Sequence, residues 1–235
     1  MNEDQLLTIV NDYFKKNIFE NHINSAKSKH IKLSSYKINP IVVKYLSKLL
    51  EDQFNPIGIA KALYYPRVLG TSINTSFGTR IQNMFVDLGL AEGSLIKGMD
   101  IEFIDHLDGR QKYCQLKSGP NTINSEDVNP LLTKFNKVAN LARTNNTKLS
   151  NSDLTLGVLY GEEHQLSKHY QKIDRTYPVI IGKELWHRIT GFENFYPKLV
   201  KGLDSIILNL DTENILKEGY LALAKDVEDS DLFNF

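Results

Sequence analysis

Two short segments of alternating polar and apolar residues, separated by an Asp-Gly pair, constrain this chain more than any other feature. They occupy MDIEFIDHLDGRQKYCQLKSG, residues 99–119, with Asp108-Gly109 between them. Asp-Gly between alternating segments is typical of a two-residue hairpin turn. The sequence therefore predicts an antiparallel β-hairpin that turns at Asp108-Gly109.

The predicted turn determines which residues face each other across the hairpin. With Asp108-Gly109 as its central pair, Asp100 lies opposite Lys117, and Glu102 lies opposite Gln115. Alternation along a strand places all four side chains on one face, and directly opposed Cβ atoms are about 5 Å apart. The other face receives a uniformly apolar set: Ile101, Phe103, Cys114 and Leu116. The hydrophobic pattern thus agrees with this register.

Two carboxylates, an amide and a lysine at this spacing suit a hard cation, because Mg²⁺ prefers oxygen ligands. A metal held by Asp100 and Glu102 would activate water and polarise a phosphodiester. Lys117 would orient the attacking water or stabilise charge in the transition state. The alternative is a surface ion pair between Asp100 and Lys117, of a kind that contributes little stability. The residues by themselves leave both interpretations open.

Hydrophobic periodicity predicts the remaining elements. Apolar residues recur at helical spacing in eight segments: 3–19, 39–50, 56–64, 75–90, 126–143, 182–191, 195–209 and 212–225. Continuous apolar runs at 154–161 and 177–182 are typical of strands buried on both faces. The order of these elements predicts an α/β fold, in which a mixed β-sheet is flanked by helices and extra helices stand at both ends of the chain.

Length and composition favour one globular domain. The chain has 235 residues, of which 41% are hydrophobic and 24% charged, values that argue against disorder and coiled coil. No linker or repeat interrupts it. We therefore expect a single domain over 1–235, with a helical N-terminal part at 1–69, a core at 70–205, and a helical C-terminal part at 206–235 that ends in an acidic tail from Asp226 to Asp231.

Three features predict a cytoplasmic protein. No apolar run approaches the roughly 18 residues of a membrane span, so no membrane partner is expected. The N-terminus is acidic and lacks the apolar segment of a signal peptide. A lone cysteine, Cys114, forms no internal disulfide and excludes a cysteine-based zinc site.

The charge is balanced overall but segregated along the chain. Residues 11–69 hold ten Lys or Arg against four acidic residues, and residues 110–150 hold seven against two. Residues 204–235 hold eight acidic residues against two Lys. Such segregation is compatible with a basic groove for a polyanion, although charge alone favours ordinary solvated faces.

The hairpin residues resemble a known nuclease motif. Asp100, followed after fourteen residues by Gln115-Leu116-Lys117, resembles the Asp…Gln-x-Lys variant of the PD-(D/E)XK motif. Four blocks, in this order, are similar to type II restriction endonucleases: TSFGTRIQNMF, QLKSGPNTIN, LGVLYGEEHQLSKHY and GKELWHRITG. They most resemble enzymes that cut interrupted palindromes of the GGNCC or RGGNCCY kind. The resemblance covers roughly residues 70–205.

This resemblance implies a homodimeric, Mg²⁺-dependent restriction-endonuclease-like hydrolase, with Mn²⁺ as a substitute metal. It would cut both strands of double-stranded DNA at a short palindrome and so restrict foreign DNA. A cognate DNA methyltransferase in the host would be its functional partner.

The same resemblance assigns roles within the hairpin. Asp100 matches the metal-binding Asp, and Lys117 matches the catalytic Lys. Gln115 stands where Glu or Asp is usual, so it would offer the metal a neutral amide oxygen. Glu102 is then the nearest replacement for the missing charge, and Gln82 occupies a place where related enzymes can present a Glu. The sequence also departs from the motif at Met99, where Pro is usual.

Other polar residues are candidates for DNA contacts. Four of them follow the catalytic strand and can donate to phosphate oxygens: Ser118, Asn121, Thr122 and Asn124. Alternatively, Asn124 or Ser125 caps the next helix. Lys134 and Lys137 lie opposite the apolar stripe of that helix, where they contact DNA or are simply solvated. The polar segment 161–176 is a candidate for reading bases.

Three alternative functions remain at this stage. A repair or structure-specific nuclease would keep the fold and cut other DNA structures. A catalytically inactive DNA-binding module is favoured by the neutral Gln115. A globular protein without a DNA role is favoured only by the zero net charge.

Overall fold

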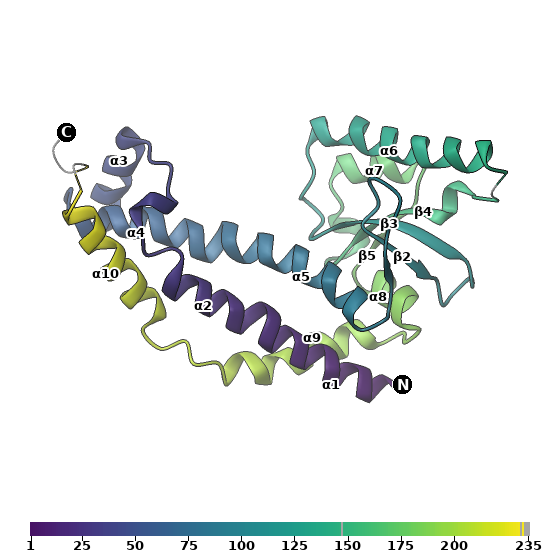
Figure 1. Ribbon diagram of the computed structural model, residues 1–235, viewed down its shortest axis with the longest axis horizontal. Coiled ribbons are helices and arrows are strands. Elements are labelled where there is room, and N and C mark those ends of the chain that lie inside the picture. The colour runs from purple at the N-terminus through teal and green to yellow at the C-terminus, as the bar shows by residue number, and fades with distance from the viewer. Residues whose placement is uncertain (147, 231, 233–235) are drawn as a thin grey trace. The chain divides into compact units, whose positions relative to one another are not determined.

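The computed structural model describes residues 1–146, 148–230 and 232 (Figure 1). The chain divides into two compact units. The core unit comprises Met1–Asp12 and Gly78–Ser205, and the helical unit comprises Tyr13–Phe77 and Ile206–Phe235. The predicted core boundaries at 70 and 205 lie close to those of the core unit, except that the first twelve residues join it and residues 70–77 do not. Whether both units fold together as one domain stays a prediction.

A five-stranded mixed sheet forms the centre of the core unit. Its strands are β1 (Glu92–Gly93), β2 (Ile101–Ile104), β3 (Gln111–Lys117), β4 (Leu154–Val158) and β5 (Val179–Ile181), adjacent in that order. The β1–β2 and β2–β3 pairs are antiparallel, whereas β3–β4 and β4–β5 are parallel. This mixed sheet, flanked by helices, confirms the predicted fold class.

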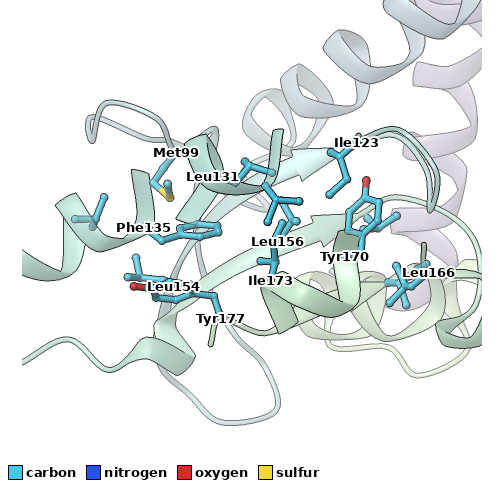
Figure 2. Packing of buried hydrophobic residues seen from close by; sticks show 14 residues of the cluster. Met99, Ile123, Leu131, Phe135, Leu154, Leu156, Leu166, Tyr170, Ile173 and Tyr177 are labelled. Carbon is cyan, nitrogen blue, oxygen red and sulfur yellow. The ribbon is translucent and has the colours of Figure 1, made fainter. Parts of the chain in front are cut away.

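Two crossover helices cover one face of the sheet. Helix α6 (Ser125–Thr144) connects β3 to β4, and α7 (Lys168–Asp174) connects β4 to β5. Right-handed crossovers that progress in one direction place both helices on the same face, as Figure 1 shows. Figure 2 shows the core between them, where Phe135 of α6 and Ile173 of α7 pack against Leu156 of β4. Every residue of β4 is buried, as its uninterrupted apolar run predicts.

The opposite face packs against α8 (Gly182–Thr190) and the end of α5 (Ile73–Asp87). The rings of Phe85 and Trp186 meet with centroids 5.1 Å apart, and the Trp186 indole donates to the Leu159 carbonyl at 2.9 Å. Gly157 leaves room for this contact layer, because a Cβ there would lie 2.8 Å from Cys114 Sγ. Burial raises the pKa of the Cys114 thiol to about 12, so this thiol is not a nucleophile at neutral pH.

The described residues form six further α-helices, of which all but α2 overlap segments of predicted helical periodicity. They are α1 (Glu3–Tyr13), α2 (Asn21–Ser28), α3 (Pro40–Glu51), α4 (Pro56–Pro66), α9 (Phe195–Leu208) and α10 (Ile215–Glu228). Wider π-helical turns span Phe14–Glu20 and Arg67–Ser72, and short 3-10 turns span Leu33–Ser35, Asn151–Asp153 and Glu163–Gln165. In the helical unit, α4 packs against α3 and α10 around buried Ile59, Tyr64 and Leu223.

The first half of the predicted acidic tail is helical instead. Helix α10 continues to Glu228, and Asp226 accepts a hydrogen bond from the Leu33 backbone N–H at 2.6 Å. A carboxylate that caps a neighbouring turn is not a solvated tail residue, so the prediction was wrong for Asp226. Asp231, at the end of that predicted tail, lies outside the described residues.

The hairpin forms, but its register differs by two residues from the prediction. Ile101 pairs with Cys114, and Glu102 pairs with Tyr113 instead of Gln115. The Asp105 N–H donates to the Arg110 carbonyl at 2.9 Å and closes a four-residue loop, 106–109. Asp108-Gly109 therefore ends the loop instead of forming its centre. A shift of two residues leaves every side chain on its predicted face but changes its partner.

A buried lysine lies beside the loop of the hairpin. Lys112 is 2% exposed, on the face predicted to be apolar, and its ammonium lies 3.9 Å from Asp105 and 3.4 Å from Asp153. A buried charge without partners is very costly, so these carboxylates stabilise the buried ammonium. The loop is further fixed because the Lys112 ammonium also donates to Asp108 at 2.5 Å.

Candidate active site

Asp100 is anchored at the start of β2 by three hydrogen bonds. Its N–H donates to the Cys114 carbonyl at 2.9 Å, and its Oδ2 accepts from the Leu116 N–H at 2.7 Å. The Gln82 amide of α5 donates to the Asp100 carbonyl at 3.3 Å. Since Ile101 pairs with Cys114, Asp100 lies beside Gln115 on the neighbouring strand. The carboxylate is thus held rigidly against β3.

Gln115 carries an unsatisfied polar atom next to this carboxylate. Its side chain is only 7% exposed, and its Oε1 is buried without a hydrogen-bond partner in the part of the chain that the structure describes. An unmet buried acceptor costs about 1–3 kcal/mol, so in native proteins such groups usually bind a water molecule, an ion or a ligand. An amide oxygen beside a fixed carboxylate is a donor set that suits Mg²⁺. The residues present therefore fit the metal that the sequence predicts.

Lys117 completes the group at the end of β3. It lies two residues beyond Gln115, so both side chains lie on the same face of the strand. The side chain is half-buried and forms no ion pair with any described residue, Asp100 included. The alternative of an Asp100–Lys117 surface ion pair is therefore wrong. The shifted register separates the two residues and leaves the ammonium available.

Glu102 does not occupy its predicted position opposite Gln115. Its two carboxylate oxygens accept hydrogen bonds from the Ser94 hydroxyl at 2.7 Å and from the Gln111 amide at 2.9 Å. Glu102 of β2 thus links Ser94, which follows β1, to Gln111 of β3. The structure thus removes the geometric basis for Glu102 as a replacement for the missing charge at Gln115.

Some of the predicted DNA-contacting residues in the loop after Lys117 have hydrogen-bond partners within the fold, and others do not. Asn124 caps α6, because its side chain accepts from the Glu126 N–H at 2.8 Å. The Thr122 hydroxyl donates to the Gly119 carbonyl at 2.9 Å. Both polar groups are therefore occupied, and the helix-capping alternative is confirmed for Asn124. Ser118 and the exposed Asn121 have no side-chain hydrogen bond within the described chain.

Both predicted lysines of α6 are exposed. Lys134 lies over the segment that leads into Asp100, since a Cβ at Gly98 would be 3.3 Å from the Lys134 Cδ. Gly98 has a φ of +101°, a conformation that favours glycine. Lys137 lies one turn further along the helix. Lys134 therefore packs on the segment just before Asp100.

A sequence model of the family described as Type II restriction endonuclease EcoO109I matches residues 69–230. The match includes the whole sheet and the segment from Asp100 to Lys117. This chain belongs to that family. It is accordingly a restriction endonuclease, a hydrolase that cleaves double-stranded DNA. No curated protein matches the chain.

This restriction endonuclease has a second polar cluster at the tip of the hairpin, which its sequence did not reveal. Asp105 is fully buried and accepts from Arg188 of α8 at 2.6 Å, while Arg110 forms a two-pronged ion pair with Asp153. Burial raises the pKa of Asp153, but hydrogen bonds from Arg110 and the Ser150 N–H outweigh it and hold that pKa below its usual value. Asp153 is therefore ionised at neutral pH, and its ion pair with Arg110 is structural.

Sequence reasoning also missed the structured part of segment 161–176 of this endonuclease. Helix α7 lies within it, and Tyr170 and Ile173 belong to the core. The Tyr170 hydroxyl donates to the Gly119 carbonyl at 2.8 Å, and burial raises its pKa to about 12. The helical spacing of Leu166, Tyr170 and Ile173 is the signal that predicts this helix. Among the described residues, no helix is long and apolar enough to cross a membrane.

Proposed function

We propose that this restriction endonuclease is a Mg²⁺-dependent homodimer that hydrolyses both strands of DNA at a short palindromic site. One observation carries the proposal. The buried, unpartnered Oε1 of Gln115 lies beside the anchored Asp100, with the unpaired Lys117 on the same face. This combination of two oxygen donors and a free ammonium suits metal-assisted phosphodiester hydrolysis.

Asp100 and Gln115 are the residues that would hold the cation, with Mn²⁺ as a substitute. When bound, Mg²⁺ supplies Lewis-acid polarisation of the phosphate and lowers the pKa of a water molecule. Asp100 contributes the negative charge, and its Oδ2 is fixed by the Leu116 N–H. Gln115 contributes a neutral oxygen that is already desolvated. We leave Glu102 outside the ligand set because both of its oxygens are engaged.

Lys117 acts on the reacting atoms directly. Its ammonium donates to the attacking water or to a phosphate oxygen, and so stabilises the charge that develops on phosphorus. Because Lys117 ends β3, it lies where the sheet meets the loop 118–124, whose Ser118 and Asn121 we assign to backbone phosphates. Lys134 and Lys137 extend this surface along α6.

A palindrome has two-fold symmetry, so two copies of the chain related by a two-fold axis each cut one strand. The enzyme would act in the cytoplasm beside a cognate methyltransferase, because unprotected host DNA would otherwise be cut. The recognition sequence is expected among interrupted palindromes of the GGNCC or RGGNCCY kind.

Digestion of unmethylated phage DNA tests the proposal. We expect discrete bands with Mg²⁺ and none with EDTA, and sequencing of the fragment ends gives the site. A smear indicates a repair or structure-specific nuclease. DNA binding without products under either Mg²⁺ or Mn²⁺ indicates an inactive module and contradicts the proposal.

The variant Lys117→Ala tests the catalytic assignment. We expect cleavage to fall about a hundred- to a thousandfold while DNA binding changes little, since one donor to a developing charge contributes roughly 10²–10³ in rate. Lys201→Ala, an exposed lysine on α9, is the matched control and should cut normally. Normal cutting by Lys117→Ala would refute the assignment.

A further inference from the structure

Tyr160 lies where the two central strands of the sheet end. The Leu159 N–H donates to the Lys117 carbonyl at 2.9 Å, so β3 and β4 are still paired at these two residues. Tyr160 is the next residue of the chain. It therefore leaves the sheet beside Lys117, at the edge where the proposed catalytic residues end.

The ring of Tyr160 packs directly on the loop that follows Lys117. A Cβ at residue 119 would lie 2.5 Å from both the Cζ and the hydroxyl oxygen of Tyr160, so the ring packs closely against Gly119 in this conformation. The Gly119 carbonyl is held in turn by the hydroxyls of Thr122 and Tyr170, at 2.9 and 2.8 Å. The phenol end of Tyr160 thus lies against a rigid segment, two residues beyond Lys117.

The hydroxyl of Tyr160 is free, in contrast to that of its neighbour Tyr170. Tyr170 is fully buried and its hydroxyl is occupied, whereas Tyr160 is 46% exposed. Within the described chain, the Tyr160 hydroxyl has no hydrogen-bond partner. The ring contributes to packing on Gly119, but among the described residues the exposed hydroxyl makes no contact that stabilises the fold. Tyrosine hydroxyls are regular donors to DNA phosphates.

We propose that Tyr160 donates its phenolic hydrogen to a backbone phosphate oxygen of the cleaved strand, adjacent to the scissile phosphate. The inference rests on the proposed function, because it requires that DNA is cut at Lys117. The contact fixes the backbone on one side of the reacting phosphate. The contact between the ring and Gly119 places the donor two residues beyond Lys117.

Tyr160→Phe removes the hydroxyl and keeps the ring on Gly119. With Ca²⁺ in place of Mg²⁺, we expect its affinity for DNA that contains the cleavage site to fall about tenfold, as for a lost hydrogen bond to a charged group. Tyr45→Phe, at an exposed tyrosine of the helical unit, should bind like the wild type. Thermal unfolding of both variants checks that each is folded.

Neutral phosphates identify the contact. One methylphosphonate is placed at each position around the cut in turn. Wild-type affinity should fall at a position adjacent to the scissile phosphate, and Tyr160→Phe should be insensitive at that same position. If the variant keeps the wild-type response at every position, Tyr160 acts only through the Gly119 loop and the proposal is wrong. Wild-type affinity and cutting in Tyr160→Phe also overturn it, whereas a wild type that does not cut contradicts the proposed function instead.

Discussion

The two ends of the β2–β3 hairpin differ in whether their buried polar side chains have partners. At the tip, Lys112 contacts Asp105, Asp108 and Asp153, and each of these charges has a partner. At the base, the Oε1 of Gln115 is buried without a partner in the described chain. Paired buried charges stabilise the fold, whereas oxygen atoms without a partner are available for a ligand. One hairpin therefore carries a structural end and a candidate functional end.

Lys112→Met is the strongest test of the structural end. It leaves Asp105 and Asp153 buried with fewer partners, so we expect the free energy of unfolding to fall by about 3–5 kcal/mol. Urea unfolding measures it, with the exposed Lys201→Met expected within about 0.5 kcal/mol of the wild type. DNA cleavage should persist at temperatures where the variant is folded. A loss below 1 kcal/mol would show that the cluster contributes little to the stability of the fold.

Gln115→Glu sharpens the contrast at the functional end. It adds a second carboxylate beside Asp100, which should lower the Mg²⁺ concentration for half-maximal cleavage about tenfold because Mg²⁺ favours charged oxygen ligands. Without metal, the like charges repel and the melting temperature should fall; Mg²⁺ should restore it. Gln53→Glu, on an exposed loop of the helical unit, should show neither effect. An unchanged Mg²⁺ requirement would place the metal away from Gln115.

The pH dependence of stability gives the smallest effect. The pKa of Asp153 is lowered in the folded state, since ion pairing with Arg110 outweighs burial. Its stabilisation is therefore complete above the unfolded pKa of about 3.9 and is lost as the pH falls through the lower folded value. Urea unfolding of Asp153→Asn should show a weaker decline below about pH 4 than the wild type. Parallel curves would assign the acid sensitivity to other carboxylates.

Local pattern predicts the elements and faces of this protein, but it did not predict all their partners. Helical spacing gave α3, α4, α6 and α8 nearly to the residue, and the apolar run gave the buried β4. These signals depend on neighbours within one or two turns or strands. The Asp-Gly signal gave the wrong hairpin partners, because it indicates a turn but does not fix the length of the loop. The buried partners of Lys112 were missed because one of them, Asp153, is 41 residues away.

The candidate site shows the same division. Its motif residues Asp100, Gln115 and Lys117 are recognisable in the sequence and share one face, because alternation is a local property. Only the tertiary structure showed that Glu102 is engaged with Ser94 and Gln111 and that Asn124 is a helix cap. A polar side chain looks equally available in any sequence, because its hydrogen-bond partners come from other segments.

The sequence by itself thus determined the α/β class, the polar face of the hairpin and the membership of the restriction endonuclease family. Tertiary structure decided which polar groups have partners within the fold and which have none. The physical reason is that burial makes every unpaired polar group costly, so packing assigns partners across the chain. Lys112 received its partners in this way, and the Oε1 of Gln115 did not.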